Sequence, residues 1–129
     1  MKISTRGRYA LIIMINLALS DKLSLKDIAD KEYLPIKYLE KIMRLLVASN
    51  LVKSIRGKDG GYVLTKKPNE YSIGEILRAS EGEIKSRACD TDDCSKHDIC
   101  PTIKFFDELY KEINEYVDNK KLSDLIKEV

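Results

Sequence analysis

Apolar residues in the N-terminal part of the chain recur at the three- and four-residue spacing of helices, in three separate stretches. The first stretch begins near Ser4 or Thr5, either of which is a suitable N-terminal cap, and runs to about Leu19. Its apolar positions cover a wide arc of the helix surface. We therefore expect this helix to be mostly buried through Ala10, Ile13, Met14, Leu17 and Ala18.

Two shorter helices are predicted to follow. Ser24 and Asp27 form an approximate capping box at the start of the second helix, whose inner face carries Leu25, Ile28 and Ala29. After a break at residues 32–35, the third helix runs from about Ile36 to Ser49, with an inner face of Leu39, Ile42, Met43, Leu46 and Val47. Two short helices joined by a short turn, after a buried helix, form the helix-turn-helix arrangement.

The pattern then changes from helical spacing to two short β-prone runs, residues 51–55 and 62–64. The loop between them, residues 56–61, is rich in glycine and charge, which favours a β-hairpin. A hairpin directly after a helix-turn-helix is a wing. The sequence therefore predicts a mostly α fold with a small β-hairpin, a winged helix-turn-helix.

A fourth helix is predicted from the capping box of Ser72 and Glu75 to about Glu81. A polar, acidic stretch, residues 82–100, separates it from a long helix that Pro101 opens and that ends near Val117 or Asp118. A short terminal helix is expected within residues 122–129. We accordingly divide the chain into a DNA-binding domain (1–81), a cysteine-rich sensor loop (82–100) and a dimerisation helix with the short terminal helix (101–129).

The long helix carries apolar residues at alternating spacings of three and four, the seam of a coiled coil: Ile103, Phe106, Tyr110, Ile113 and Val117. The earlier helices of so short a chain have little surface left to cover this stripe. A two-fold dimer also suits helix-turn-helix proteins, which bind two half-sites. We therefore favour a homodimer interface over an intramolecular core.

The net charge of +2 conceals a division between the two halves of the chain. Residues 1–67 carry 14 Lys and Arg against 6 Asp and Glu, a balance of +8. Residues 68–129 carry 9 against 15, a balance of −6. Such asymmetry indicates contact of the basic half with double-stranded DNA, although an unevenly charged, solvated surface is the simpler alternative.

The candidate DNA-binding residues lie in three places. The outer face of the third helix can reach base edges and phosphates through Lys37, Tyr38, Glu40, Lys41 and Arg44. At the wing tip, Gly57 permits a close approach of the backbone, so Arg56 is expected in a minor groove and Lys58 on a phosphate. Near the N-terminus, Lys2 and Arg8 are suited to phosphate contacts.

Three motifs of the chain together resemble the Rrf2 family of bacterial winged-helix regulators. These are residues 1–10 (MKISTRGRYA), residues 38–40 (YLE), and SIRG at 54–57 followed by GGYVL at 60–64. The similarity extends to the closing KLSDL at 121–125. It implies a homodimer that binds a near-palindromic operator to repress or activate transcription, with a sensor loop before the dimer helix.

All three cysteines of the chain, Cys89, Cys94 and Cys100, lie in the polar loop. An odd number of thiols in a reducing compartment favours metal or redox chemistry over disulfides. The resemblance implies that the three are ligands of an iron–sulfur cluster, either 2Fe–2S or 4Fe–4S. Some family members use a histidine three residues after the last cysteine as fourth ligand, and that position here is Ile103.

The fourth ligand therefore stays open, with His97, an aspartate of the loop, solvent and the partner subunit as candidates. Zinc bound by the three cysteines and His97, or thiol oxidation without any metal, are the alternatives. Some family members lack a cluster and respond to a partner enzyme of cysteine synthesis, so a cluster-free repressor of cysteine metabolism is the second functional hypothesis.

Other classes of protein find little support in the sequence. A cysteine-nucleophile enzyme would need Cys94 or Cys100 with His97, but no cofactor fingerprint or paired-carboxylate motif accompanies them. The longest apolar run, residues 10–15, is too short to span a membrane and has no signal-peptide cleavage site. We expect a cytoplasmic protein that is not an enzyme and has no membrane partner.

Overall fold

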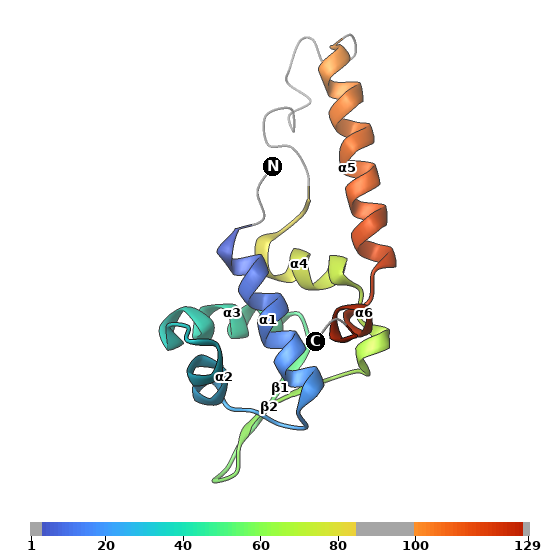
Figure 1. Cartoon of the computed structure of the whole chain (residues 1–129). Coiled ribbons are helices and arrows are strands. Elements are labelled where there is room, and N and C mark those ends of the chain that lie inside the picture. The colour runs from blue at the N-terminus through green and yellow to red at the C-terminus, as the bar shows by residue number, and fades with distance from the viewer. Residues whose placement is uncertain (1–3, 85–99, 128–129) are drawn as a thin grey trace.

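The computed structural model describes residues 4–84 and 100–127 (Figure 1). In chain order, the elements are α1 (Thr5–Leu19), α2 (Leu25–Glu32), α3 (Ile36–Ala48), β1 (Val52–Ile55), β2 (Gly61–Leu64), η1 (Pro68–Glu70), α4 (Ile73–Glu81), α5 (Pro101–Asn119) and α6 (Leu122–Ile126). The predicted fold class, a mostly helical chain with one β-hairpin wing, is confirmed.

Local sequence signals mark the starts of α2, α4 and α5. Ser24 with Asp27, and Ser72 with Glu75, form full capping boxes at the starts of α2 and α4, as predicted. Pro101 occupies the first turn of α5. Ser4 stands at the N-cap position of α1 but makes no capping bond with its side chain; its hydroxyl instead contacts the Glu81 carboxylate at the end of α4.

The main hydrophobic core forms around α1, which packs against α3, α4 and α6. Ala10, Ile13 and Met14 of α1 are fully buried there. The predicted inner face of α3 joins them through Leu39, Ile42, Met43 and Leu46, together with Leu122 of α6. Burial of the α1 and α3 stripes holds the helix-turn-helix rigid and leaves the opposite face of α3 to solvent.

The wing contains β1 and β2, paired antiparallel from Val52 opposite Leu64 to Ile55 opposite Gly61. A backbone bridge adds Leu23, just before α2, to the outer side of β2: Leu23 and Tyr62 exchange both of their N–H to O hydrogen bonds, at 3.2 and 2.8 Å. The wing is thereby tied to the start of α2. Sequence patterning did not predict this pairing.

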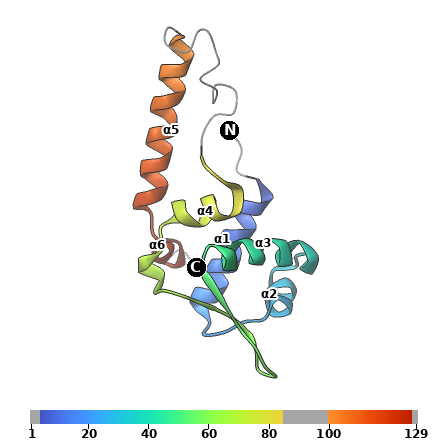
Figure 2. The ribbon, with the colours of Figure 1, turned by 180° about the vertical axis from the view of Figure 1, so that it is seen from behind.

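The long helix α5 extends away from the body of the molecule, and Figure 1 and Figure 2 both place its first turn at the opposite end from the wing tip. Its last turns pack against α4, where Val117 forms a small second core with Ile73 and Leu77. The Arg78 guanidinium of α4 donates two hydrogen bonds, of 2.7 and 3.1 Å, to the Asp118 carboxylate. The C-terminal end of α5 is thus fixed to the winged domain.

Candidate nucleic-acid interface

The outer face of α3 carries a stripe of exposed cations. Lys37, Lys41 and Arg44 are exposed and lie three or four residues apart, so they share one side of the helix. Glu40 is half-buried beside them. Like charges at this spacing destabilise an isolated helix, and an anionic partner removes that repulsion.

Tyr38, predicted as a DNA contact, is half-buried and packs on the main core. Its ring meets Tyr9 of α1 edge-on, with centroids 5.3 Å apart. This pair fastens the first turn of α3 to α1. Any DNA contact by Tyr38 is therefore limited to the exposed part of its side chain, and packing is its observed role.

The turn between α2 and α3 contains an unusual residue, Tyr33. Its backbone is left-handed, at φ 56° and ψ 46°, and its N–H caps α2 on the Ala29 carbonyl. The side chain is 93% exposed, so it makes little contact with the rest of the chain. Left-handed backbone costs a tyrosine about 1 kcal/mol, which Gly or Asn largely avoids.

Glycines shape the wing tip as the sequence predicts. Gly57 adopts φ 116°, which side chains rarely allow, and its carbonyl accepts the Gly60 N–H at 3.0 Å to close the turn. A Cβ on Gly60 would overlap the Ile55 carbonyl oxygen. This tight turn leaves Arg56 and Lys58 exposed at the end of the hairpin.

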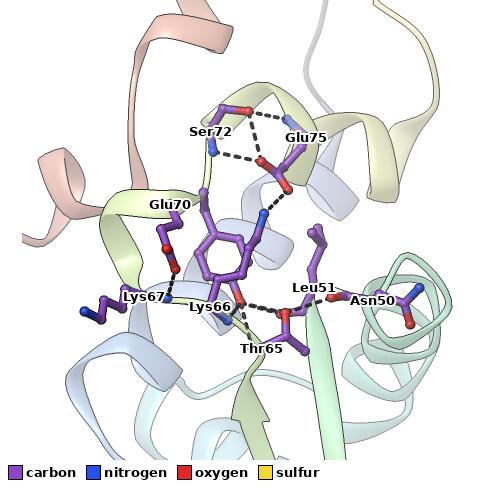
Figure 3. A network of polar contacts seen from close by, with 9 residues as sticks. Asn50, Leu51, Thr65, Lys66, Lys67, Glu70, Ser72 and Glu75 are labelled. Carbon is purple, nitrogen blue, oxygen red and sulfur yellow. Dashed lines mark hydrogen bonds and ion pairs between the residues drawn. The ribbon is translucent and has the colours of Figure 1, made fainter.

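The base of the wing is held by a network that sequence reasoning missed (Figure 3). The buried Tyr71 hydroxyl donates to the Leu51 carbonyl at 2.7 Å and accepts the Thr65 N–H at 2.8 Å and the Lys66 N–H at 3.0 Å. The Thr65 hydroxyl adds a 2.8 Å bond to the Asn50 carbonyl. The chain on both sides of the hairpin base is therefore tied to Tyr71, which lies two residues before α4.

An ion pair completes this network. Lys66 Nζ lies 2.9 Å from Glu75 Oε1 and 4.7 Å from the centre of the Tyr71 ring. Burial would raise the pKa of Glu75, but hydrogen bonds from Lys66 and from the Ser72 backbone outweigh it, so the pKa is lowered. Glu75 thus stays ionised at neutral pH while it caps α4 and pairs with Lys66.

Only some of the predicted N-terminal cations and sensor residues lie within the part of the chain that the structure describes. Arg8 is exposed on α1, whereas Lys2 lies outside the described residues, as do Cys89, Cys94 and His97. Cys100 is half-buried at the N-cap position of α5, with its Sγ 2.8 Å from Thr102 Oγ1. Residues 4–84 and 100–127 contain no cluster of three metal-ligating side chains.

The predicted seam of α5 divides into two parts. Val117 packs inside its own chain, and Ile103 is buried. Tyr110 and Ile113 are half-buried, and Phe106 is exposed together with Phe105 and Tyr116 on the same helix. Phe106 stacks on Tyr110, at 6.2 Å between centroids, and meets Phe105 edge-on. An aromatic surface therefore runs along the protruding part of α5.

A winged helix-turn-helix with an exposed basic helix and a glycine-turned wing defines the class of DNA-binding transcriptional regulators. Residues 3–128 match the family Rrf2, described as "Iron-dependent Transcriptional regulator". The chain belongs to the Rrf2 family, which confirms the resemblance seen in the sequence. Within the described residues, no helix is both long and apolar enough to cross a bilayer.

Known relatives include proteins with two different names, IscR and CymR. The HTH-type transcriptional regulator IscR of Pectobacterium atrosepticum is 31% identical over 130 residues, which cover 98% of this chain and 79% of that protein. The HTH-type transcriptional regulator CymR of Bacillus subtilis is 49% identical over 87 residues, 65% of this chain and 63% of that protein. Both are regulators rather than enzymes, and so is this chain.

Solved structures show the same duality. The structure of CymR, "the Global Cysteine Regulator of B. subtilis", has a TM-score of 0.82 at 37% identity, covering 100% of this chain and 98% of that one. T. potens IscR has a TM-score of 0.81 at 34% identity, covering 99% and 88%. The winged-helix fold is therefore confirmed, while the two names leave the sensing chemistry open.

Proposed function

We propose that the protein is a homodimer that binds a near-palindromic operator, with α3 in the major groove and the wing in the adjacent minor groove. The observation that carries this proposal is the joint exposure of the α3 cations and the wing-tip cations on a rigid frame. Lys37, Lys41 and Arg44 serve base edges and phosphates, and Arg56 enters the minor groove with Lys58 on a phosphate. Glu40 accepts a hydrogen bond from a cytosine amino group.

The dimer forms through the aromatic surface of α5. Phe105 and Tyr116 are 58% and 67% exposed, more than aromatic side chains of this size usually are in a folded chain. A two-fold pairing of α5 with a second α5 buries them and sets the separation of the two α3 helices. The match to two half-sites of an operator follows from that symmetry.

The cysteine segment serves as the sensor, and an iron–sulfur cluster is the group that its donors suit best. Three thiols within twelve residues form a soft donor set of the kind that holds such clusters, and Cys100 at the N-cap of α5 joins this set directly to the dimer helix. Cys89, Cys94 and Cys100 are the proposed ligands, with His97 as a candidate fourth. When bound, the cluster supplies a reduction potential and a sensitivity to oxidant or nitric oxide.

The alternative function is a cluster-free repressor of cysteine metabolism, controlled by thiol oxidation or by a partner enzyme of cysteine synthesis. The 49% identity to CymR over 87 residues supports this alternative. Zinc in place of the cluster is a further possibility for the same thiols. In every case we infer a cytoplasmic protein, because that is where its DNA target would lie.

The experiment that separates these functions is anaerobic purification followed by a visible absorption spectrum and assays of iron, sulfide and zinc. The cluster proposal predicts a brown protein with stoichiometric iron and sulfide. In that case Cys89→Ala, Cys94→Ala and Cys100→Ala each lose the colour, whereas His97→Ala loses it only if His97 is a ligand. A colourless protein that also resists reconstitution contradicts the cluster and leaves the CymR-like function or zinc.

A further inference from the structure

Tyr71 connects the base of the wing with the end of the long helix α5. Its side chain is fully buried, and its hydroxyl contacts three backbone groups at the base of the wing: the Leu51 carbonyl and the N–H groups of Thr65 and Lys66. The hydroxyl also lies 3.1 Å from Thr65 Oγ1. One phenolic oxygen therefore contacts the residue before β1 and the two residues after β2.

The backbone of the same residue is tied to the end of the long helix. The Tyr71 carbonyl accepts the Leu122 N–H at 3.0 Å, and the Ile73 N–H donates to the Lys120 carbonyl at 2.8 Å. Between them, Ser72 forms a β-bridge with Lys121. This short ladder joins the segment before α4 to the turn between α5 and α6.

From this geometry we propose that Tyr71 is a positioning residue for the wing: its hydroxyl sets the angle at which the hairpin meets DNA and keeps that angle fixed relative to the end of α5. The proposal rests on the proposed DNA-binding function of the wing. Tyr71 itself is buried and touches no DNA; it acts through Arg56.

The hairpin is long enough for a small tilt at its base to displace its tip. Four residues of strand at about 3.3 Å each place the turn about 13 Å from the base, so a tilt of about 10° there moves the tip by about 2 Å. The hairpin has other tethers among the described residues: the Leu23–Tyr62 pairing lies on the outer side of β2, the Leu51 N–H donates to the Leu46 carbonyl, and the Thr65 hydroxyl donates to the Asn50 carbonyl. The Tyr71 hydroxyl differs from the first two in that its bonds reach the backbone at both ends of the hairpin.

The test is a double-mutant cycle of operator affinity with Tyr71→Phe, Arg56→Ala and Lys37→Ala, measured on the full chain well below its unfolding temperature. Arg56→Ala should weaken binding about tenfold or more, and Tyr71→Phe alone by about three- to tenfold. In the Arg56→Ala background, Tyr71→Phe should change affinity by less than about twofold, because the misplaced group is already gone. With Lys37→Ala the two losses should multiply.

Ile76→Val is the control for an effect that comes only from lower stability, because Ile76 is fully buried on α4, away from the wing. A second readout needs no DNA: hydrogen exchange of the Thr65 and Lys66 amides should accelerate in Tyr71→Phe and stay unchanged in Ile76→Val. Equal exchange in the two variants, or a Tyr71→Phe loss of the same size with and without Arg56, overturns the positioning role. A wild-type protein that binds no DNA contradicts the proposed function instead, and the exchange measurement then still decides whether the Tyr71 hydroxyl holds the base of the hairpin.

Discussion

Replacing Lys41 by Gln tests whether the cationic face of α3 contacts phosphates. In α3 and the wing, four exposed cations per protomer are assigned to phosphate or to mixed phosphate and base contacts: Lys37, Lys41, Arg44 and Lys58. Through these residues alone, a dimer would neutralise about eight phosphates, which predicts a slope of about −7 or steeper for the logarithm of the binding constant against the logarithm of the salt concentration. Lys41→Gln removes one contact per protomer and should reduce the slope by about 1.8.

The assay is fluorescence anisotropy of a labelled duplex titrated with protein at several salt concentrations between about 50 and 300 mM, a range in which counterion release dominates the affinity. Lys127→Gln is the matched control, because Lys127 is also exposed but lies at the end of α6, where its neighbour is Asp124. Its slope should equal that of the wild type. A wild-type slope shallower than about −2, or the same loss of slope in both variants, would refute the assignment of this face to DNA.

Three further predictions concern stability. The lowered pKa of Glu75 means that its carboxylate stabilises the fold above its usual pKa and that this contribution is lost as the pH falls through the lowered value. Glu75→Gln should therefore be less stable than wild type in urea at pH 7, and the difference should shrink steadily as the pH falls below the usual pKa of a glutamate. Gly74→Ala places a Cβ against the Asp118 carboxylate and should lower the free energy of unfolding by about 1 kcal/mol, because overpacking exceeds the gain in helix propensity. In an Asp118→Ala background, which itself lacks the pair with Arg78, Gly74→Ala should cause no further loss, and an undiminished loss there would refute the clash. Tyr33→Asn should raise the melting temperature, since it relieves about 1 kcal/mol of left-handed strain at an exposed site, whereas a fall would reveal contacts that its 93% exposure does not suggest.

The sequence predicted the helix-turn-helix and the wing because their signals are local. Capping pairs such as Ser72 and Glu75, and the glycines of the wing turn, specify backbone geometry within a few residues. The apolar stripe of α3 likewise specified which face is buried, and so which cations remain exposed.

The contacts that position the wing were not predicted, because each joins residues far apart in the sequence. Tyr71 reaches Leu51 across 20 positions, and Arg78 reaches Asp118 across 40. No periodicity marks such pairs. A buried tyrosine hydroxyl requires a partner, but the sequence does not say which one.

The seam of α5 illustrates a different limit of sequence analysis. Its spacing of three and four describes an apolar face, and a dimer interface and an intramolecular core share that pattern. The structure places Val117 in an intramolecular core with Ile73 and Leu77, while Phe106 stays exposed. One stripe thus serves two purposes, and its spacing alone does not locate the boundary between them. The dimer itself stays a prediction.

The most direct test of the central claim is to select operators from a pool of random duplexes and then to measure the mass of the selected complex. The account predicts enrichment of a near-palindrome whose half-sites lie about one helical turn, or a multiple of it, apart, bound by two copies of the chain. Bases beneath the wing should favour A·T pairs, which narrow the minor groove around Arg56. Enrichment of a single half-site bound by one copy, or no enrichment over the starting pool, would contradict it.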